Sequence, residues 1–191
     1  MKRLIPLILP ALALAACQSE KPVQRSQTPS FYVSMARAGA EVDSAMARDM
    51  IGAYRGNNGL RPLTLDPDLQ AAAQAEAEAM ARADKPSSAE AFKARLASTG
   101  FAAPAANLSA GYHTLAEAFS GWRESPQHNR VLLDARATRI GIATAYAPNS
   151  KYKVYWVLAV AADRRLSAQH RSRRRQSGTE PFRNLTYVSR L

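Results

Sequence analysis

The chain has 191 residues, of which 47% are hydrophobic and 21% are charged, and its formal net charge is +11 at pH 7. This length suits one domain with extensions, and the single cysteine, Cys17, excludes an intramolecular disulfide. The charge is uneven: in residues 163–191, eight arginines against Asp163 and Glu180 give +6. Such a run of charges is typical of a solvated tail and does not indicate a charged surface on a folded domain. We therefore expect no nucleic-acid partner.

The N-terminal segment has the pattern of a secretory signal. A basic start, Met1-Lys2-Arg3, precedes an apolar stretch from Leu4 to Ala16 that is too short to span a bilayer. Leu14-Ala15-Ala16 places small residues directly before Cys17. These features predict a signal peptide at residues 1–16.

The motif Leu14-Ala15-Ala16-Cys17 resembles the lipobox of bacterial lipoproteins, in which the cysteine is lipidated and becomes the mature N-terminus. The resemblance implies a membrane partner through acylated Cys17, because several acyl chains hold a protein on a membrane. Gln18, where an acidic residue would indicate inner-membrane retention, favours the outer membrane, facing the periplasm. The alternative is a soluble secreted protein whose cysteine lies there by chance. Residues 17–40 are expected to form the lipidated N-terminus and a tether.

The domain itself is expected at residues 41–162. Four apolar residues with the spacing i, i+3, i+4 and i+7 predict a first helix: Ala47, Met50, Ile51 and Tyr54. The turn-forming run 56–59 ends it. Asp66 followed by Pro67 is a cap with proline at the first helical position, and together they predict a second helix that runs to about Ala83.

Glu76 lies within the apolar face of this second helix. The other members of that face are Leu69, Ala72, Ala73 and Met80. A carboxylate that faces a core carries a large desolvation cost unless it is paired, coordinated or in a wet cleft. Glu76 is therefore either a cleft residue with a functional role, or a structural residue that forms an ion pair with an arginine or reaches solvent from a rotated helix end.

The next two helices are predicted from capping residues. Ser87 or Ser88 caps a short helix that ends at Gly100, and the stretch from Pro104 to Tyr112 is expected to be a loop. A capping box then begins a helix with a strong apolar face. The box is Thr114 to Glu117, and the face is Leu115, Ala118, Phe119 and Trp122.

Ser125-Pro126 begins a further helix, with His128 in its first turn. The helix dipole disfavours an imidazolium there and keeps the ring neutral. A neutral imidazole suits a metal ligand or a hydrogen-bond partner, and the alternative is a structural histidine with satisfied hydrogen bonds. Which of these roles His128 has depends on which side chains the fold places beside the first turn of this helix.

Two strands are expected after the helices. Ile140 and Ile142 alternate around Gly141 in the first, and a turn at 147–150 leads to the second. One face of the second strand carries Val154, Trp156, Leu158 and Val160. Helices that precede a hairpin, with no alternation of strand and helix, predict an α+β fold with an antiparallel sheet. Trp122 and Trp156 are expected in its core.

The most specific motif is Trp122-Arg123-Glu124-Ser125-Pro126-Gln127-His128-Asn129-Arg130-Val131-Leu132-Leu133. It is accompanied by the runs 57–63, 69–81, 107–112 and 140–143 and by the strand that holds Trp156. Together they resemble the CAP superfamily (cysteine-rich secretory, antigen 5 and pathogenesis-related 1 proteins), in its bacterial disulfide-free branch. The resemblance implies an α-β-α sandwich around a central antiparallel sheet, with strands that periodicity alone does not predict.

The family's central cleft commonly carries two histidines and two acidic residues, which hold a divalent metal in some members. In this chain His128 is retained, Glu76 replaces the second-helix histidine, Ala106 replaces the glutamate before Asn107, and Ser125 takes the fourth position. The resemblance implies that Glu76 and His128 face one another across a common groove. The full set of expected cleft residues is Glu76, Asn107, His113, Ser125 and His128. One imidazole and one carboxylate are too few for a zinc site, so we expect no metal and no cofactor.

The expected function is a monomeric, lipid-anchored, non-catalytic binding module for a lipid, a glycan or an envelope protein. The alternative is a periplasmic hydrolase or peptidase in which His128 is the general base, Glu76 orients it and Ser125 is the nucleophile. That alternative needs the Ser125 hydroxyl within hydrogen-bond reach of His128, whereas a cap serine normally accepts from backbone N–H groups. The basic segment 163–191 is expected to be disordered, with contact to an anionic surface as the alternative.

Overall fold

The computed structural model describes residues 28–163; the predicted signal peptide, Cys17 and the basic tail after Asp163 lie outside the described residues. Within this range the chain forms one short 3-10 helix, five α-helices and four strands. In chain order they are η1 (Ser30–Tyr32), α1 (Ser44–Asn57), β1 (Thr64–Leu65), α2 (Pro67–Ala83), α3 (Ala89–Ser98), β2 (Ala102–Ala110), α4 (Leu115–Glu124), α5 (Pro126–Leu132), β3 (Arg139–Tyr146) and β4 (Val154–Ala162).

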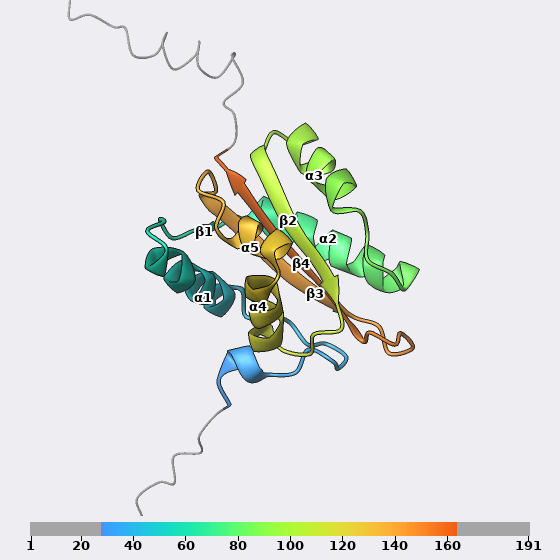
Figure 1. Ribbon diagram of the computed structural model, residues 1–191. Helices are drawn as coiled ribbons and strands as arrows, with labels where there is room; N and C mark the ends of the chain where they lie inside the picture. Colours follow the sequence, from blue (N-terminus) through green and yellow to red (C-terminus); the bar gives the residue numbers. More distant parts are fainter. Residues whose placement is uncertain (1–27, 164–191) are drawn as a thin grey trace, which may run out of the picture.

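The four described strands form one sheet in the order β1-β3-β4-β2. β4 pairs antiparallel with both β3 and β2, and only the two-residue β1 runs parallel to its neighbour β3, with Thr64 opposite Arg139. Helices cover both faces of the sheet (Figure 1): α1, α4 and α5 lie on one face, and α2 and α3 lie on the other. The predicted α+β class and the α-β-α sandwich are confirmed.

The helices begin and end close to where the sequence predicts. Asp43, Asp66, Ser88 and Thr114 each accept a backbone N–H bond at the start of α1, α2, α3 and α4. The capping box of α4 is shifted by one residue, because the Glu117 carboxylate accepts from the N–H of His113 rather than from that of Thr114. These bonds satisfy N–H groups that a helix leaves unpaired in its first turn.

The expected loop between Pro104 and Tyr112 is wrong, because most of it belongs to strand β2. Its alanine-rich sequence has low strand propensity and gives no alternating pattern. It is a strand because it pairs with β4 from Ala105 to Ala110, after a bulge between Ala102 and Ala105. Ala103 within this bulge has a φ of 44°. The bulge and Pro104 lie at the start of an edge strand, where both are tolerated.

The expected boundary between tether and domain at residue 41 also differs from the structure. Met35 is only 4% exposed, and its N–H donates to the carbonyl of His113 at 2.7 Å. Phe31 and Val33 pack against the same core as α1 and α4. The segment that follows Ser30 is therefore part of the domain, because its apolar residues cover one end of that core.

Candidate functional site

Two grooves border α3, and the second of them reaches β2, an edge strand of the sheet. The first, which we call the apolar groove, has a volume of about 810 Å³ and lies between α2 and α3. It is lined by Asp68, Ala72, Ala75, Glu76, Ala79, Ser87, Phe92, Arg95, Leu96, Thr99 and Phe101. The second, which we call the polar groove, has a volume of about 770 Å³ and lies where α3 and α5 border β2. Its lining includes Ala106, Asn107 and His128 together with charged residues of α3 and of the segment after α5.

In the polar groove, Asn107 fixes the orientation of His128. The fully buried Asn107 side chain donates from Nδ2 to the backbone carbonyl of His128 at 3.0 Å. Its Oδ1 lies 3.0 Å from His128 Nδ1. Because the carbonyl needs a donor, the amide orientation is determined, and Nδ1 must carry the proton that Oδ1 accepts. The Nε2 atom of His128 is then an acceptor.

Burial lowers the pKa of the His128 imidazole below its ordinary value, so the ring is neutral at neutral pH. This agrees with the neutral ring expected from its place in the first turn of α5. Two ion pairs lie at the same groove: Lys93 with Glu90 at 2.6 Å, and Arg136 with Asp134 at 2.7 Å. The polar groove thus offers a hydrogen-bond acceptor between charged walls.

In the apolar groove, Glu76 is 7% exposed and forms an ion pair with Arg95 of α3. The Arg95 guanidinium also lies 5.6 Å from the centre of the Phe92 ring. Of the two interpretations of Glu76, the structure supports the ion pair with an arginine. The ion pair offsets the free-energy cost of desolvating the Glu76 carboxylate on an otherwise apolar helix face.

The expectation that Glu76 and His128 share one groove is wrong. Along β2, Ala106 belongs to the core of the α2 and α3 face, whereas Asn107, the next residue, bonds to His128 of α5. Successive side chains of a strand point to opposite faces, so Glu76 and His128 are separated by the sheet. Each has its own partner, Arg95 or Asn107.

The remaining expected cleft residues, Ser125 and His113, line neither groove. Ser125 precedes α5 but makes no side-chain cap bond, contrary to expectation, and no bond joins its hydroxyl to His128 among the described residues. His113 is exposed before α4. Within residues 28–163 no group of three or more His, Cys, Asp or Glu side chains is placed to hold a metal ion.

The family model described as the cysteine-rich secretory protein family, CAP, matches residues 48–160, more than half of the chain. The chain belongs to this family. The CAP domain is also similar to a cysteine-rich secretory protein of Staphylococcus aureus, with 17% identity and a TM-score of 0.53 over 62% of this chain and 38% of that one. No curated protein sequence matches it.

Two further solved structures share the fold of this CAP domain. An outer surface protein of Borrelia burgdorferi has 17% identity and a TM-score of 0.55, over 63% of this chain and 92% of that one. An extracellular protein of Bacillus anthracis that contains an SCP domain has 17% identity and a TM-score of 0.52, over 63% of this chain and 40% of that one. The chain thus spans less than half the length of the Staphylococcus and Bacillus proteins, and at this identity the likeness shows the fold.

Sequence reasoning missed Arg55, a buried charged residue of the CAP domain. It is 1% exposed and donates to four backbone carbonyls: those of Arg61 at 2.9 Å, Leu132 at 2.8 Å, Asp134 at 3.0 Å and Ala137 at 3.3 Å. Burial lowers the pKa of its guanidinium, and the charge of Asp134 opposes that shift. The signal was present, since Arg55 continues the stripe of Ala47 and Ile51 at i+4, as Glu76 does on α2.

None of the described helices combines the length and apolar character needed to cross a bilayer.

Proposed function

We propose that this CAP domain is a lipid-anchored, monomeric envelope module that binds a lipid in the apolar groove without transforming it. The observation that carries the proposal is the lining of that groove: alanines of α2 and Phe92, Leu96 and Phe101, with one ion pair among them. Ligand sites are typically concave and mostly apolar, with a few convergent polar groups, and occupy about 300–1,000 Å³. An acyl chain suits the apolar wall, and Arg95 suits a polar or anionic headgroup.

The arrangement of the candidate catalytic groups supports binding rather than hydrolysis. A general base needs a nucleophile or a water in reach and a group that orients it. His128 is oriented by the Asn107 amide, and Glu76 lies on the other side of the sheet with Arg95. The Ser125 hydroxyl has no bond to His128. A glycan or a protein remains the alternative ligand, and the polar groove is the place for it.

Two observations support an envelope location. Leu14-Ala15-Ala16-Cys17 resembles a lipobox, and two proteins of similar fold are described as extracellular or as an outer surface protein. We propose that residues 1–16 are removed, that Cys17 is acylated, and that the domain faces the periplasm from the outer membrane, as Gln18 favours. Residues 18–27 then tether the domain, and residues after Asp163 form the basic tail.

The anchor is tested separately from the ligand. Cys17→Ser should abolish incorporation of a labelled fatty acid and shift the protein out of the detergent-extracted membrane fraction. Labelling that persists in Cys17→Ser would contradict the anchor.

The ligand is tested with an environment-sensitive fluorescent fatty acid and two matched variants of the soluble Cys17→Ser protein. Ala75→Trp places a large ring in the apolar groove, whereas Ala97→Trp places the same ring on an exposed α3 position outside it. We expect binding in the parent and in Ala97→Trp, and at least a tenfold loss in Ala75→Trp. Equal binding by both variants, or none by the parent, would contradict a lipid site in this groove.

A further inference from the structure

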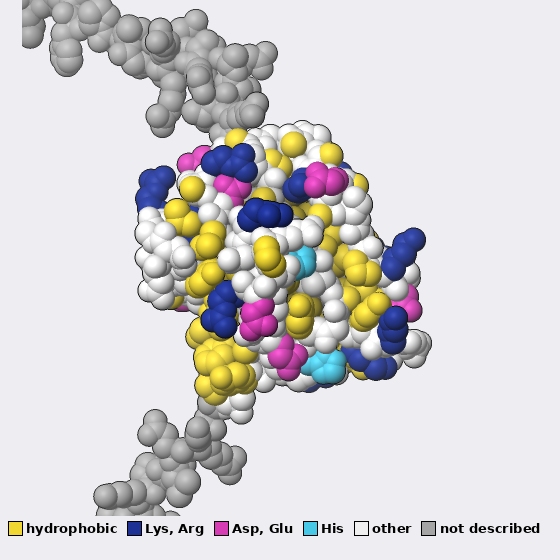
Figure 2. Space-filling view, in the orientation of Figure 1, with side chains coloured by type: hydrophobic (Ala, Val, Ile, Leu, Met, Phe, Trp, Pro, Cys, Tyr) yellow, Lys and Arg dark blue, Asp and Glu magenta, His cyan; other side chains and the backbone are white. Residues whose placement is uncertain are grey.

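Tyr32 is the one large hydrophobic side chain left exposed among residues 28–163, with 59% of its surface accessible. It ends the short helix η1, and its ring lies against that of Phe31, with ring centres 4.5 Å apart. Phe31 and Val33 on either side of it are partly buried against the core. Figure 2 shows the resulting hydrophobic surface at one end of the domain. We call Phe31, Tyr32 and Val33 the η1 patch.

Local backbone bonds shape the η1 patch, and the neighbouring Met35 joins this segment to the rest of the domain. The Tyr32 N–H donates to the carbonyl of Pro29 at 2.9 Å, and the Val33 N–H donates to that of Ser30 at 3.2 Å. Two residues later, buried Met35 is bonded to the segment before α4. With Phe31 and Val33 packed inward, the outward direction of Tyr32 is a property of the folded domain.

The chain enters the domain next to this patch. Thr28, where the described structure begins, is 11 residues after Cys17. A chain extends by at most about 3.6 Å per residue, so Thr28 lies within about 40 Å of Cys17, and the η1 patch begins three residues after Thr28. A lipid surface that carries Cys17 is therefore held close to the patch, which raises its effective concentration there.

We propose that the η1 patch is the membrane-facing surface of the domain, with the Tyr32 ring at the headgroup level of the bilayer that carries acylated Cys17. The inference rests on the proposed lipid anchor. Tyrosine is favoured at membrane interfaces because its ring is apolar and its hydroxyl remains hydrated. Arg37, exposed five residues further on, adds a positive charge to this segment that anionic headgroups would attract.

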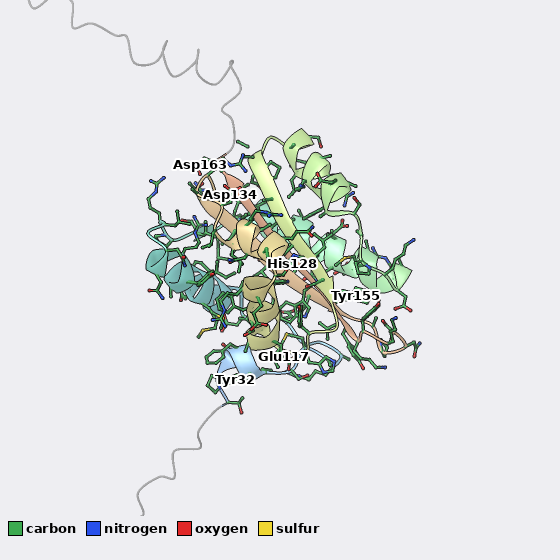
Figure 3. The ribbon with its side chains drawn as sticks, viewed as in Figure 1. Tyr32, Glu117, His128, Asp134, Tyr155 and Asp163 are labelled. Atoms are coloured by element: carbon green, nitrogen blue, oxygen red, sulfur yellow. The ribbon has the colours of Figure 1, made fainter. Side chains whose placement is uncertain are left out.

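This orientation has a geometrical consequence. Tyr32 lies at one end of the molecule, and Asp134 and Asp163 lie toward the other (Figure 3). With Tyr32 on the bilayer, Asp163, the last described residue, lies on the side of the domain directed away from that membrane.

The test uses the full lipidated protein reconstituted into vesicles that contain brominated phospholipids, which quench tryptophan at the interface. Tyr32→Trp introduces a reporter at the patch, and Ala135→Trp introduces the same reporter at an exposed position beside Asp134. The native Trp122 and Trp156 are fully buried and provide a constant background. We expect the Tyr32→Trp reporter to be blue-shifted and to lose at least half of its emission, while the Ala135→Trp reporter stays unquenched.

Four outcomes would overturn the inference, and they are distinguishable. Vesicle flotation with an unquenched reporter in Tyr32→Trp would refute the membrane-facing patch and leave the anchor intact. Equal quenching of both reporters would show that the domain has no preferred orientation. Failure of the parent protein to float with vesicles would refute the anchor and this inference with it. A blue shift that depends on protein concentration, without quenching, would identify a second copy of the chain as the occupant instead.

Discussion

The two faces of the sheet are packed by different kinds of residue. On the α1, α4 and α5 face the core is built from large side chains, among them Trp122, Trp156 and the buried Arg55. On the α2 and α3 face much of it is alanine, and α2 lies so close to β3 that a Cβ at Gly141 would overlap the backbone of Leu69 and Gln70. Burial of large side chains stabilises the first face, whereas close packing of α2 against β3 stabilises the second. The small side chains of α2 also leave the apolar groove open beside α3.

The largest effect is expected on the face with large side chains. Trp122 and Trp156 are fully buried, their ring centres are 6.1 Å apart, and each indole N–H has an acceptor: Ser109 Oγ for Trp122 and the carbonyl of Tyr112 for Trp156. Trp122→Ala should lower the free energy of unfolding by about 3–5 kcal/mol, a large part of the total for a domain. Urea denaturation measures it, with Trp122→Phe as the milder control. An unchanged midpoint for Trp122→Ala would contradict the packing described for this face.

On the alanine-rich face, adding a single methyl group should be damaging. Gly141→Ala forces α2 away from β3 and should cost about 1–3 kcal/mol, since overpacking a tight core shifts the backbone. The control is Gly56→Ala near the end of α1, where nothing lies within 4 Å of the added Cβ. There the same change should stabilise by about 0.5–1 kcal/mol through helix propensity. Thermal melts that rank the two variants the other way would contradict the close approach of α2.

The ion pair of the apolar groove should contribute less. Arg95→Ala leaves the Glu76 carboxylate without its partner, but Arg95 is 57% exposed, so water screens the interaction. We expect a loss of about 1 kcal/mol for Arg95→Ala. Glu76→Gln combined with Arg95→Ala should recover part of it, because the double variant leaves no unpaired charge. A double-mutant cycle by denaturation measures the coupling, and additive single effects would show that the pair does not stabilise the fold.

The smallest effect concerns the polar groove and depends on pH. Burial holds the pKa of His128 below its unfolded value of 6.5, so the unfolded chain binds the proton more readily. The free energy of unfolding should therefore decline as the pH falls from about 6.5 toward the folded pKa of His128. Below that pKa, protonation of His128 should cause no further change. His128→Gln should flatten the pH dependence of the melting midpoint in that window. An identical profile for the variant would show that His128 is as free to protonate in the fold as in the unfolded chain.

Local signals predicted the helices well, because caps such as Asp66 and Thr114 and the 3.6-residue stripes are read over short distances. β2 could not be predicted in this way, since its strand character comes from pairing with β4 about fifty residues later. The prediction that Glu76 and His128 share one groove was wrong for a related reason. Glu76 was correctly identified as inward-facing, but whether it meets His128 depends on which side of β2 each helix packs, and no local pattern contains that information.

The buried contacts of Arg55 also join the first helix to segments that come much later in the chain. Its guanidinium bonds to the carbonyl of Ala137, 82 residues later in the chain, and β1 pairs with β3 at Arg139 and Ile140. Contacts between such distant segments form slowly, because a long loop must close before they stabilise anything. The first helix and strand therefore cannot reach their final partners until nearly the whole domain has been synthesised. Late folding of this kind keeps the chain unfolded for longer, and unfolded is the form in which the proposed signal peptide, residues 1–16, would direct it across a membrane.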